Sequence, residues 1–356
     1  MKLIISAGGT GGHIFPGIAV AETFVAQKEN HNVLFIGTTY GLESKIIPQY
    51  GFRLLFVEAR QFLGRSSVYK AATIFYILKG IYKCRSIIKR EKPDAILGMG
   101  GFTSVPVILA GTMCGVPIFL HEQNAEPGLA NKVLAKYAKG IFVSFEESCQ
   151  LLKSKNIYHT GNPVRKAVKV PRENKNDETF GIFVFGGSRG AKSINDSVVS
   201  LLPYLDGNKS VIFFHQTGEE DYTRIKEAYM KSNIKHEVFP FTDNMAQYYN
   251  RSDVVISRSG ASTIFELAYF RKASILIPYP FSAGQHQWKN ASHVETAGGG
   301  YIIGNNEATG EKLYETIKHL MDEPVLLKQM GENMGRLYVE DSQERIIAKI
   351  LEKVKA

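Results

Sequence analysis

The 356-residue sequence has few cysteines, no long apolar run and no leader-like start. Cys84, Cys114 and Cys149 lie far apart, without a CxxC pair or a histidine at metal-ligand spacing, which argues against zinc and indicates a reducing compartment. No stretch approaches the roughly 20 apolar residues that span a bilayer. One lysine and a short apolar run precede the first glycines, so no signal peptide is expected. We expect a cytosolic protein.

Acidic residues are scarce in one segment of the chain. The net charge is +9 at pH 7. Residues 1–163 hold 18 lysines and arginines against 10 acidic residues, whereas the remainder holds 25 against 24. Residues 60–92 alone carry nine basic residues and one acid. The excess positive charge is therefore concentrated in this segment, which suggests a function specific to it.

The chain is long enough for two domains, and its 44% hydrophobic and 22% charged residues are typical of globular proteins. Short apolar runs alternate with helix-like segments, which predicts an α/β protein with doubly wound parallel sheets. The alternation restarts after a polar stretch at 165–178, so we expect two Rossmann-like domains facing each other across a cleft. Strands are predicted at 2–6, 32–37, 53–57, 94–98, 116–120, 140–144, 179–185, 210–215, 235–239, 253–257, 274–278 and 300–303, and helices in the first half at 17–28, 41–50, 68–91, 103–114, 127–138 and 146–153.

A glycine-rich turn, Gly8–Gly12, joins the first predicted strand to a helix. The dinucleotide fingerprint needs an acidic residue at the end of the second strand, but strand 32–37 is followed by no carboxylate until Glu43. A nicotinamide site is therefore disfavoured, and no Walker lysine supports phosphoryl transfer from ATP. The turn is either an anion site of backbone N–H groups at a helix N-terminus or a tight turn that only allows close helix–sheet packing.

His13 follows this turn directly, and Pro16 is expected to fix the first turn of the helix. A single histidine is commonly structural. This one, however, lies beside an anion-binding turn at the carboxyl end of a strand, and imidazole titrates near neutrality. The position predicts a general base.

Further polar or glycine-rich segments also follow predicted strands, where open α/β sheets bind ligands. In 257–267 (SRSGASTIFEL), free N–H groups and the positive end of a helix dipole can face a diphosphate. Glu266 either closes a capping box with Thr263 or accepts hydrogen bonds from a ribose diol. The other segments are 98–106 (GMGGFTSVP), 121–128 (HEQNAEPG), 185–195 (FGGSRGAKSIN) and 284–291 (GQHQWKNA).

The basic segment 60–92 contains a helix-like stretch whose apolar residues fall on one stripe between lysines and arginines. It is either an ordinary helix with a solvated basic face or a peripheral attachment site on an anionic membrane, at about 1 kcal/mol per basic residue. Nucleic acid lacks support, because no nucleic-acid-binding motif accompanies the charge. The membrane-facing residues would be Arg65, Lys70, Phe75, Leu78, Lys79, Tyr82, Lys83, Lys89 and Arg90.

Seven segments closely resemble, in order and at similar spacing, the MurG family of peptidoglycan N-acetylglucosaminyltransferases: GGTGGHIFPGIAVAE, GMGGFTSVP, HEQNAEPGLANK, TGNPVR, FGGSRGA, SRSGASTIFEL and HQWKNA. The resemblance covers essentially the whole chain and implies a GT-B fold. Residues 1–163 with 341–356 would form an acceptor and membrane-docking domain, and 164–340 a donor domain. The implied reaction is inverting. It moves GlcNAc from UDP-GlcNAc to the 4-hydroxyl of the N-acetylmuramoyl unit of undecaprenyl-diphospho-MurNAc-pentapeptide, which converts lipid I to lipid II.

The resemblance also implies roles for individual residues, with His13 as the base. No Asp-x-Asp pair is present, so no cofactor or essential metal is expected, and helix dipoles, N–H groups and Arg165 would stabilise the leaving diphosphate. The acceptor diphosphate would lie on Gly8, Gly9, Gly11, Gly12, Gly100 and Gly101. The donor would contact Thr10, Gly11, Gly12, Asn124, Arg165, Ser188, Thr242, Ala261, Ser262, Thr263, Glu266 and Gln287.

Two residues depart from the family pattern: Arg189 stands where glutamine is usual, and Phe265 where many members carry serine. The implied partners are UDP-GlcNAc, lipid I, the anionic cytoplasmic face of the cell membrane and other proteins of cell-wall synthesis. Two alternatives stay open. A UDP-GlcNAc 2-epimerase would share the donor site without needing the basic patch, and a non-catalytic UDP-sugar-binding scaffold would bind the donor without transferring it.

Overall fold

The computed structural model describes residues 1–59, 67–172, 179–187 and 189–355, and for 67–74 it describes the backbone alone. Two predicted site residues, Arg65 and Ser188, lie outside the described residues, as does the side chain of Lys70. The chain divides into two compact units: unit 1 is Met1–Arg165 with Val339–Ala356, and unit 2 is Lys166–Tyr338. The predicted boundaries are 163–164 and 340–341. Each unit is described by itself.

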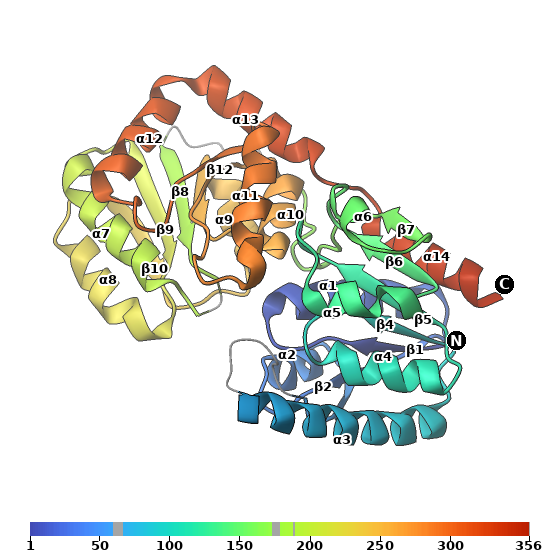
Figure 1. Ribbon diagram of the computed structural model, residues 1–356. Helices are drawn as coiled ribbons and strands as arrows, with labels where there is room; N and C mark the ends of the chain where they lie inside the picture. The colour runs from blue at the N-terminus through green and yellow to red at the C-terminus, as the bar shows by residue number, and fades with distance from the viewer. Residues whose placement is uncertain (60–66, 173–178, 188, 356) are drawn as a thin grey trace. The chain divides into compact units, whose positions relative to one another are not determined.

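Unit 1 is built on a seven-stranded parallel sheet with the strand order β3-β2-β1-β4-β5-β6-β7 (Figure 1). The chain starts in the middle of this sheet, moves outward to β3 and returns to β4, so the strand order reverses between β1 and β4. The strands are β1 (Lys2–Ser6), β2 (Asn32–Gly37), β3 (Arg53–Phe56), β4 (Ala95–Gly98), β5 (Ile118–Glu122), β6 (Gly140–Val143) and β7 (Ile157–His159). The helices are α1 (Gly11–Gln27), α2 (Glu43–Gln49), α3 (Ser67–Glu91), α4 (Ser104–Met113), α5 (Leu129–Leu134), η1 (Ala135–Tyr137), α6 (Ser148–Leu151) and α14 (Ser342–Lys355).

Unit 2 repeats this plan with a six-stranded parallel sheet in the order β10-β9-β8-β11-β12-β13. Its strand order reverses between β8 and β11. The strands are β8 (Phe180–Phe185), β9 (Val211–Gln216), β10 (Lys235–Phe239), β11 (Val254–Ser257), β12 (Ala273–Leu276) and β13 (Gly300–Ile302). The helices are α7 (Lys192–Leu205), η2 (Glu219–Asp221), α8 (Tyr222–Met230), α9 (Met245–Arg251), α10 (Ala261–Phe270), η3 (Ala283–Gln285), α11 (His286–Thr296), α12 (Gly310–Asp322) and α13 (Pro324–Arg336).

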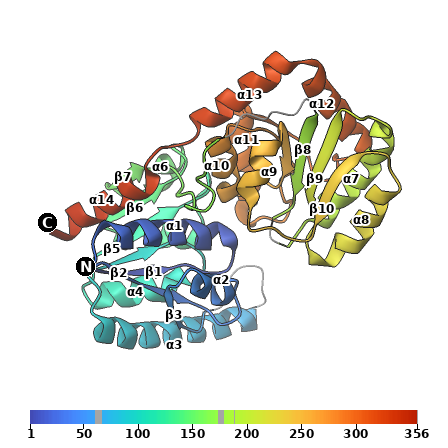
Figure 2. The ribbon, with the colours of Figure 1, turned by 180° about the vertical axis from the view of Figure 1, so that it is seen from behind.

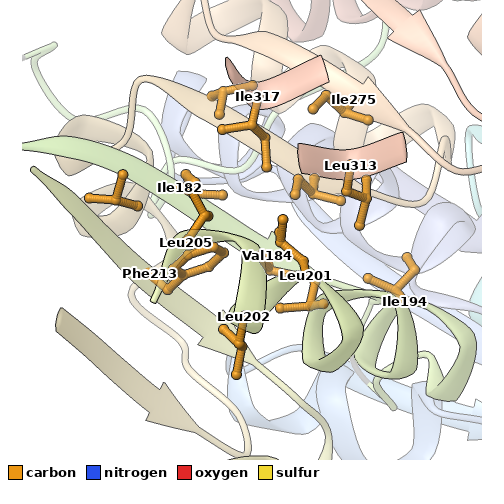
Figure 3. Close-up of a cluster of buried hydrophobic side chains, with 14 of the residues drawn as sticks. Ile182, Val184, Ile194, Leu201, Leu202, Leu205, Phe213, Ile275, Leu313 and Ile317 are labelled. Atoms are coloured by element: carbon orange, nitrogen blue, oxygen red, sulfur yellow. The ribbon is translucent and has the colours of Figure 1, made fainter. Parts of the chain in front are cut away.

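Helices cover both faces of each sheet, which is why the strands are apolar almost without interruption. In unit 1, Leu3 and Ile5 of β1 pack with α1 and α14, whereas Ile4 between them packs with α3 and α4 on the other face. Figures 1 and 2 show these two helix layers on opposite sides of the sheet. In unit 2, side chains of α7 and α12 meet those of β8, β9 and β12 in one buried cluster (Figure 3).

The two Rossmann-like parallel-sheet units confirm the predicted fold class, while the cleft between them stays a prediction. One helix differs clearly from its predicted range. α1 begins at Gly11 rather than at 17, and Pro16 therefore lies inside it instead of in its first turn. Glycine and proline are poor helix formers, but Ile14, Ile18 and Ala21 of this helix are buried, and that packing outweighs the weak local propensity.

Candidate active site

The first candidate region lies where the strand order of unit 1 reverses. The last residues of β1 and β4, Ser6 and Gly98, pair in register, so the loops that follow them emerge side by side. A Cβ on Gly101 would lie 3.3 Å from the carbonyl oxygen of Gly8, which shows how closely the loops approach. Gly100 and Gly101 have φ of 88° and 76°, values that favour glycine. The structure therefore brings the six predicted acceptor glycines to one sheet edge, where such folds bind ligands.

Glu43 of α2 holds the first of these loops and was missed by sequence reasoning. Its buried carboxylate accepts hydrogen bonds from the N–H of Gly9 at 3.0 Å and from the N–H and hydroxyl of Thr38 at 2.8 and 2.6 Å. The N–H of Gly9 is thus engaged, whereas those of Gly11 and Gly12 find no acceptor among the described residues. The N–H groups suited to an anion are therefore those at the start of α1. Glu43 therefore connects the turn before α1 to Thr38, the residue after β2.

His13 is the third residue of α1 and is half-buried. Its ring lies against the turn after β4, because a Cβ on Gly100 would be 3.2 Å from its Cε1. Its Nδ1 lies 3.0 Å from Oε1 of Gln123, in the loop after β5. Its Nε2 has no hydrogen-bond partner within the part of the chain that the structure describes. One ring nitrogen is therefore held in place and the other is available at the ligand-binding edge.

The loop after β5 is organised by Glu122, which is buried. Its carboxylate accepts hydrogen bonds from the N–H of Asn124 at 3.0 Å, the N–H of Gly128 at 2.9 Å and the side chain of Asn131 at 2.8 Å. The side-chain amide of Asn124 also donates to Glu122, at 3.2 Å. The predicted donor contact of Asn124 therefore stays a prediction, and what the structure adds is a fixed conformation for its loop.

Arg165, predicted to meet the nucleotide, is the last residue of the first segment of unit 1. Its guanidinium carbon lies 3.9 Å from the ring centre of Phe15, and one N–H reaches the hydroxyl of Tyr50 at 3.5 Å. Thr242, another predicted donor contact, belongs to unit 2, where its N–H donates to Gln216 at 3.1 Å. Both donor contacts stay predictions.

The second candidate region lies at the corresponding reversal point of unit 2, where Phe185 of β8 pairs with Ser257 of β11. The loop after β11 leads into α10, whose N-cap is Gly260. The first N–H bonded back to this cap is that of Ile264, at 3.0 Å. The N–H groups of Ala261, Ser262 and Thr263 therefore lack acceptors among the described residues, as does the buried hydroxyl of Ser262. This helix end is suited to a phosphate group.

The capping-box interpretation of Glu266 is wrong. Thr263 is the third residue of α10 and not its N-cap, so the T-x-x-E spacing lies wholly inside the helix. Glu266 is 7% exposed, and its Oε2 accepts a hydrogen bond from the hydroxyl of Tyr249 at 3.0 Å. The tyrosine holds this carboxylate near the start of α10, and its contact with a ribose stays a prediction.

Arg258 directly after β11 was also missed by sequence reasoning. It donates to the carbonyls of Ile277 and Pro278 at 2.9 and 3.1 Å, to Asn305 at 2.9 Å and to the hydroxyl of Ser193 at 2.7 Å. Burial lowers the pKa of its guanidinium, which stays cationic. These partners, which come from α7 and from the loops after β12 and β13, are all neutral, so the guanidinium has no carboxylate partner among the described residues. An arginine at the carboxyl end of a predicted strand was the available signal.

Gln287 lies in the first turn of α11 and is brought to the start of α10 by Ser259. The Ser259 hydroxyl donates to the carbonyl of Gln287 at 2.7 Å, and Oε1 of Gln287 accepts the N–H of Tyr279 at 2.9 Å. The structure thus gathers Gln287 with Ala261, Ser262, Thr263 and Glu266 in unit 2, which are five of the predicted donor residues.

Clusters of metal ligands and membrane-spanning helices are both absent from the described residues. No group of three or more histidine, cysteine, aspartate or glutamate side chains there could hold a metal ion. None of the helices in the same residues is both long and apolar enough to cross a membrane.

Comparison with known proteins covers both units. Residues 3–143 match the Glycosyltransferase family 28 N-terminal domain, and residues 181–346 match the Glycosyltransferase family 28 C-terminal domain. The chain is 41% identical over 353 residues to the UDP-N-acetylglucosamine–N-acetylmuramyl-(pentapeptide) pyrophosphoryl-undecaprenol N-acetylglucosamine transferase of Geotalea uraniireducens, which covers 98% of this chain and 97% of that protein. The protein of the same name from Geobacter metallireducens is 40% identical, with 99% and 98% covered.

The chain is also similar to solved structures of related proteins. The crystal structure of Acinetobacter baumannii MurG matches with a TM-score of 0.80 and 27% identity over 99% of both chains. UDP-GlcNAc 2-epimerase from Neisseria meningitidis bound to UDP-GlcNAc matches with a TM-score of 0.69 over 99% of this chain and all of that one. At 14% identity, the second comparison concerns the fold alone.

Proposed function

This chain belongs to the MurG family within glycosyltransferase family 28, and we propose that it transfers N-acetylglucosamine from UDP-GlcNAc to undecaprenyl-diphospho-N-acetylmuramoyl-pentapeptide, converting lipid I to lipid II. The observation that carries this function is the identity near 40%, over almost the whole chain, to transferases of this name. The 2-epimerase has the same fold but only 14% identity, so it gives that alternative no further support.

The transfer replaces one bond at the anomeric carbon of GlcNAc by another. The 4-hydroxyl oxygen of the N-acetylmuramoyl unit attacks this carbon, and the bond from the carbon to the diphosphate oxygen breaks, so that UDP leaves with the bonding electrons. The hydroxyl proton moves to Nε2 of His13, and a β-1,4 bond forms with inversion. The available Nε2 at the edge of the unit 1 sheet supports this role.

The leaving diphosphate gains negative charge, and unit 2 offers positive groups that need no rearrangement to meet it. The N–H groups of Ala261, Ser262 and Thr263 would donate to its oxygens. Arg258, three residues before Ala261 in the sequence, adds a full positive charge, held by neutral partners. In unit 1, the N–H groups of Gly11 and Gly12 would in the same way hold the diphosphate of the lipid acceptor.

Replacing Glu266 with glutamine tests the ribose contact. A hydrogen bond to a charged group contributes about 1.5–3 kcal/mol, so KM for UDP-GlcNAc should rise at least about tenfold while KM for the lipid acceptor stays unchanged. Initial rates over a series of donor concentrations measure this. Tyr249→Phe is the matched variant, since it removes the hydroxyl that donates to Oε2 and keeps the carboxylate of Glu266. A wild-type donor KM in Glu266→Gln would remove Glu266 from the nucleotide site.

The exposed face of α3 supports attachment to an anionic membrane on the cytoplasmic side. Phe75, Leu78 and Tyr82 lie one turn apart and are 64%, 60% and 80% exposed. The opposite face, with Cys84, Ile87 and Ile88, packs in the core. An apolar stripe facing outward on a basic helix favours docking at a lipid headgroup layer over the solvated-helix alternative.

The basic residues on this helix differ in their partners. Lys79 is paired with Glu58 at 2.9 Å and Arg90 with Glu91 at 3.3 Å, whereas Lys83 and Lys89 have no ion pair among the described residues. Changing Lys83 and Lys89 together to glutamine should weaken binding to anionic vesicles about 30-fold. Vesicle sedimentation at a fixed salt concentration measures this. Lys231→Gln with Lys235→Gln in unit 2 removes the same charge, and equal weakening by both pairs would contradict docking through α3.

Radiolabelled UDP-GlcNAc with a short-chain lipid I analogue tests the function itself. Label in the lipid product, dependent on the protein, supports the transferase. UDP together with free N-acetylmannosamine would indicate the 2-epimerase instead. Donor binding without either product would leave a UDP-sugar-binding scaffold and overturn the proposed function.

A further inference from the structure

We propose that Gln123 is a positioning residue that fixes His13 in the tautomer with its proton on Nδ1, leaving the Nε2 lone pair for the acceptor hydroxyl. The inference rests on the proposed function, in which His13 is the base. It follows from a chain of hydrogen bonds that runs through unit 1 from Met99 and Gly161 to the imidazole. Each bond in this chain determines which group can donate in the next.

The side-chain amide of Gln123 has only one orientation that suits its surroundings. Gln123 is 1% exposed, so solvent does not compete for its polar atoms. One of its two polar atoms lies 2.9 Å from the carbonyl oxygen of Met99. A backbone carbonyl can only accept, so this atom is the nitrogen Nε2 and not the oxygen. The reversed amide would place two acceptors against each other.

The contact with His121 requires the same orientation of the Gln123 amide. Its Nδ1 lies 2.9 Å from Nε2 of Gln123, and its Nε2 lies 3.4 Å from the carbonyl oxygen of Gly161. Burial lowers the pKa of His121 to about 4, so its ring is neutral near pH 7 and carries a single proton. That proton lies on Nε2, toward the carbonyl. Nδ1 therefore accepts the second N–H of Gln123.

With both N–H groups of Gln123 directed to these acceptors, its Oε1 faces Nδ1 of His13 at 3.0 Å. An amide oxygen can only accept, so Nδ1 of His13 carries a proton. A neutral imidazole has one protonated nitrogen, and the lone pair consequently lies on Nε2. The other tautomer would direct the lone pairs of Nδ1 and Oε1 at each other.

The ring is also restrained by packing. A Cβ on Gly100 would lie 3.2 Å from Cε1 of His13 and 3.3 Å from Nδ1, and a Cβ on Gly101 would lie 3.4 Å from Cδ2. The turn after β4 therefore lies along the imidazole and opposes a flip of the ring. When Nε2 takes a proton, Nδ1–H keeps its bond to Oε1, so proton transfer needs no rearrangement of the ring.

The direct test is the protonation of the ring nitrogens. In protein labelled with ¹⁵N-histidine at pH 8, the nitrogen spectrum distinguishes a protonated from an unprotonated ring nitrogen, and a His13→Asn variant assigns the His13 signals. We expect protonated Nδ1 and unprotonated Nε2 in the wild-type protein. A protonated Nε2 with an unprotonated Nδ1 overturns the proposal, whatever any variant does.

Gln123→Met keeps the side-chain length and removes the hydrogen bonds. We expect its His13 signals to lose the single-tautomer pattern, and kcat to fall by about 10- to 100-fold with an unchanged KM for UDP-GlcNAc. Gln150→Met, at an exposed glutamine of unit 1, is the matched control and should keep the wild-type His13 signals and the wild-type kcat. Wild-type kcat in Gln123→Met overturns the positioning role. Absence of lipid transfer by the wild-type protein would instead overturn the proposed function and leave the tautomer result standing.

Discussion

Replacing His13 with alanine is expected to lower kcat by about 10²- to 10⁴-fold, the range that a positioned general base contributes. The variant keeps the glycine loops but lacks the imidazole that we propose accepts the hydroxyl proton. UDP-GlcNAc binding should stay within about twofold of wild type, because the start of α10 and Glu266, which we propose to bind the donor, belong to unit 2. Steady-state rates with both substrates varied, and calorimetric titration with UDP, measure the two quantities separately.

His159→Ala is the matched control for this change. His159 is an exposed histidine of the same unit, and its Nε2 lies 3.1 Å from the carbonyl oxygen of Ser144. Loss of this imidazole should leave kcat unchanged. Wild-type turnover in His13→Ala would show that another group takes the proton, and the positioning role of Gln123 would be refuted with it.

Gly190→Ala is expected to be the most destabilising of the glycine substitutions in the loop before α7. Gly190 has φ of 75°, where an L side chain costs about 1–2 kcal/mol. In addition, its Cβ would collide with the carbonyl oxygen of Thr217, and overpacking typically costs about 1–3 kcal/mol more. The loop cannot avoid both costs without shifting, so unit 2 should unfold at a clearly lower urea concentration and donor binding should weaken.

Gly207→Ala separates these two costs. Gly207 has almost the same φ, 74°, but a Cβ there would meet nothing within 4 Å. The single tryptophan of the chain, Trp288, lies in α11 and is 47% exposed, so its fluorescence reports the unfolding of unit 2. We expect Gly207→Ala to lower the stability of unit 2 to urea less than Gly190→Ala does. An equal loss of stability in the two variants would mean that the close approach of Gly190 to Thr217 does not matter.

The sheets were predictable because their strands are buried on both faces. An apolar run such as 179–185 has few alternatives once glycine loops and helices flank it, and β8 covers Phe180–Phe185. The strand that was missed, β7, has three residues, Ile157–His159, none of them buried. It is an edge strand whose residues carry no apolar pattern, so only its pairing with β6 defines it.

The loops of the candidate site were predictable from their position after strands, but their supporting residues were not. Glu43 meets Gly9, Gln123 meets Met99 and Arg258 meets Ser193 only after the strands are paired. Each contact joins residues distant in sequence, and no local pattern indicates it. His13 could be found because its own position after a glycine turn carries the signal.

The return of the chain to unit 1 has a consequence for the order of synthesis. Ile346, Ile347 and Ile350 of α14 pack in the same cluster as Leu3, Ile5 and Ile18. A ribosome makes every residue of unit 2 before it makes α14. Unit 2 is contiguous and can therefore complete its core first, while the unit 1 cluster formed by β1 and α1 still lacks the side chains of α14. The part of the protein that is translated first is thus the part that finishes folding last.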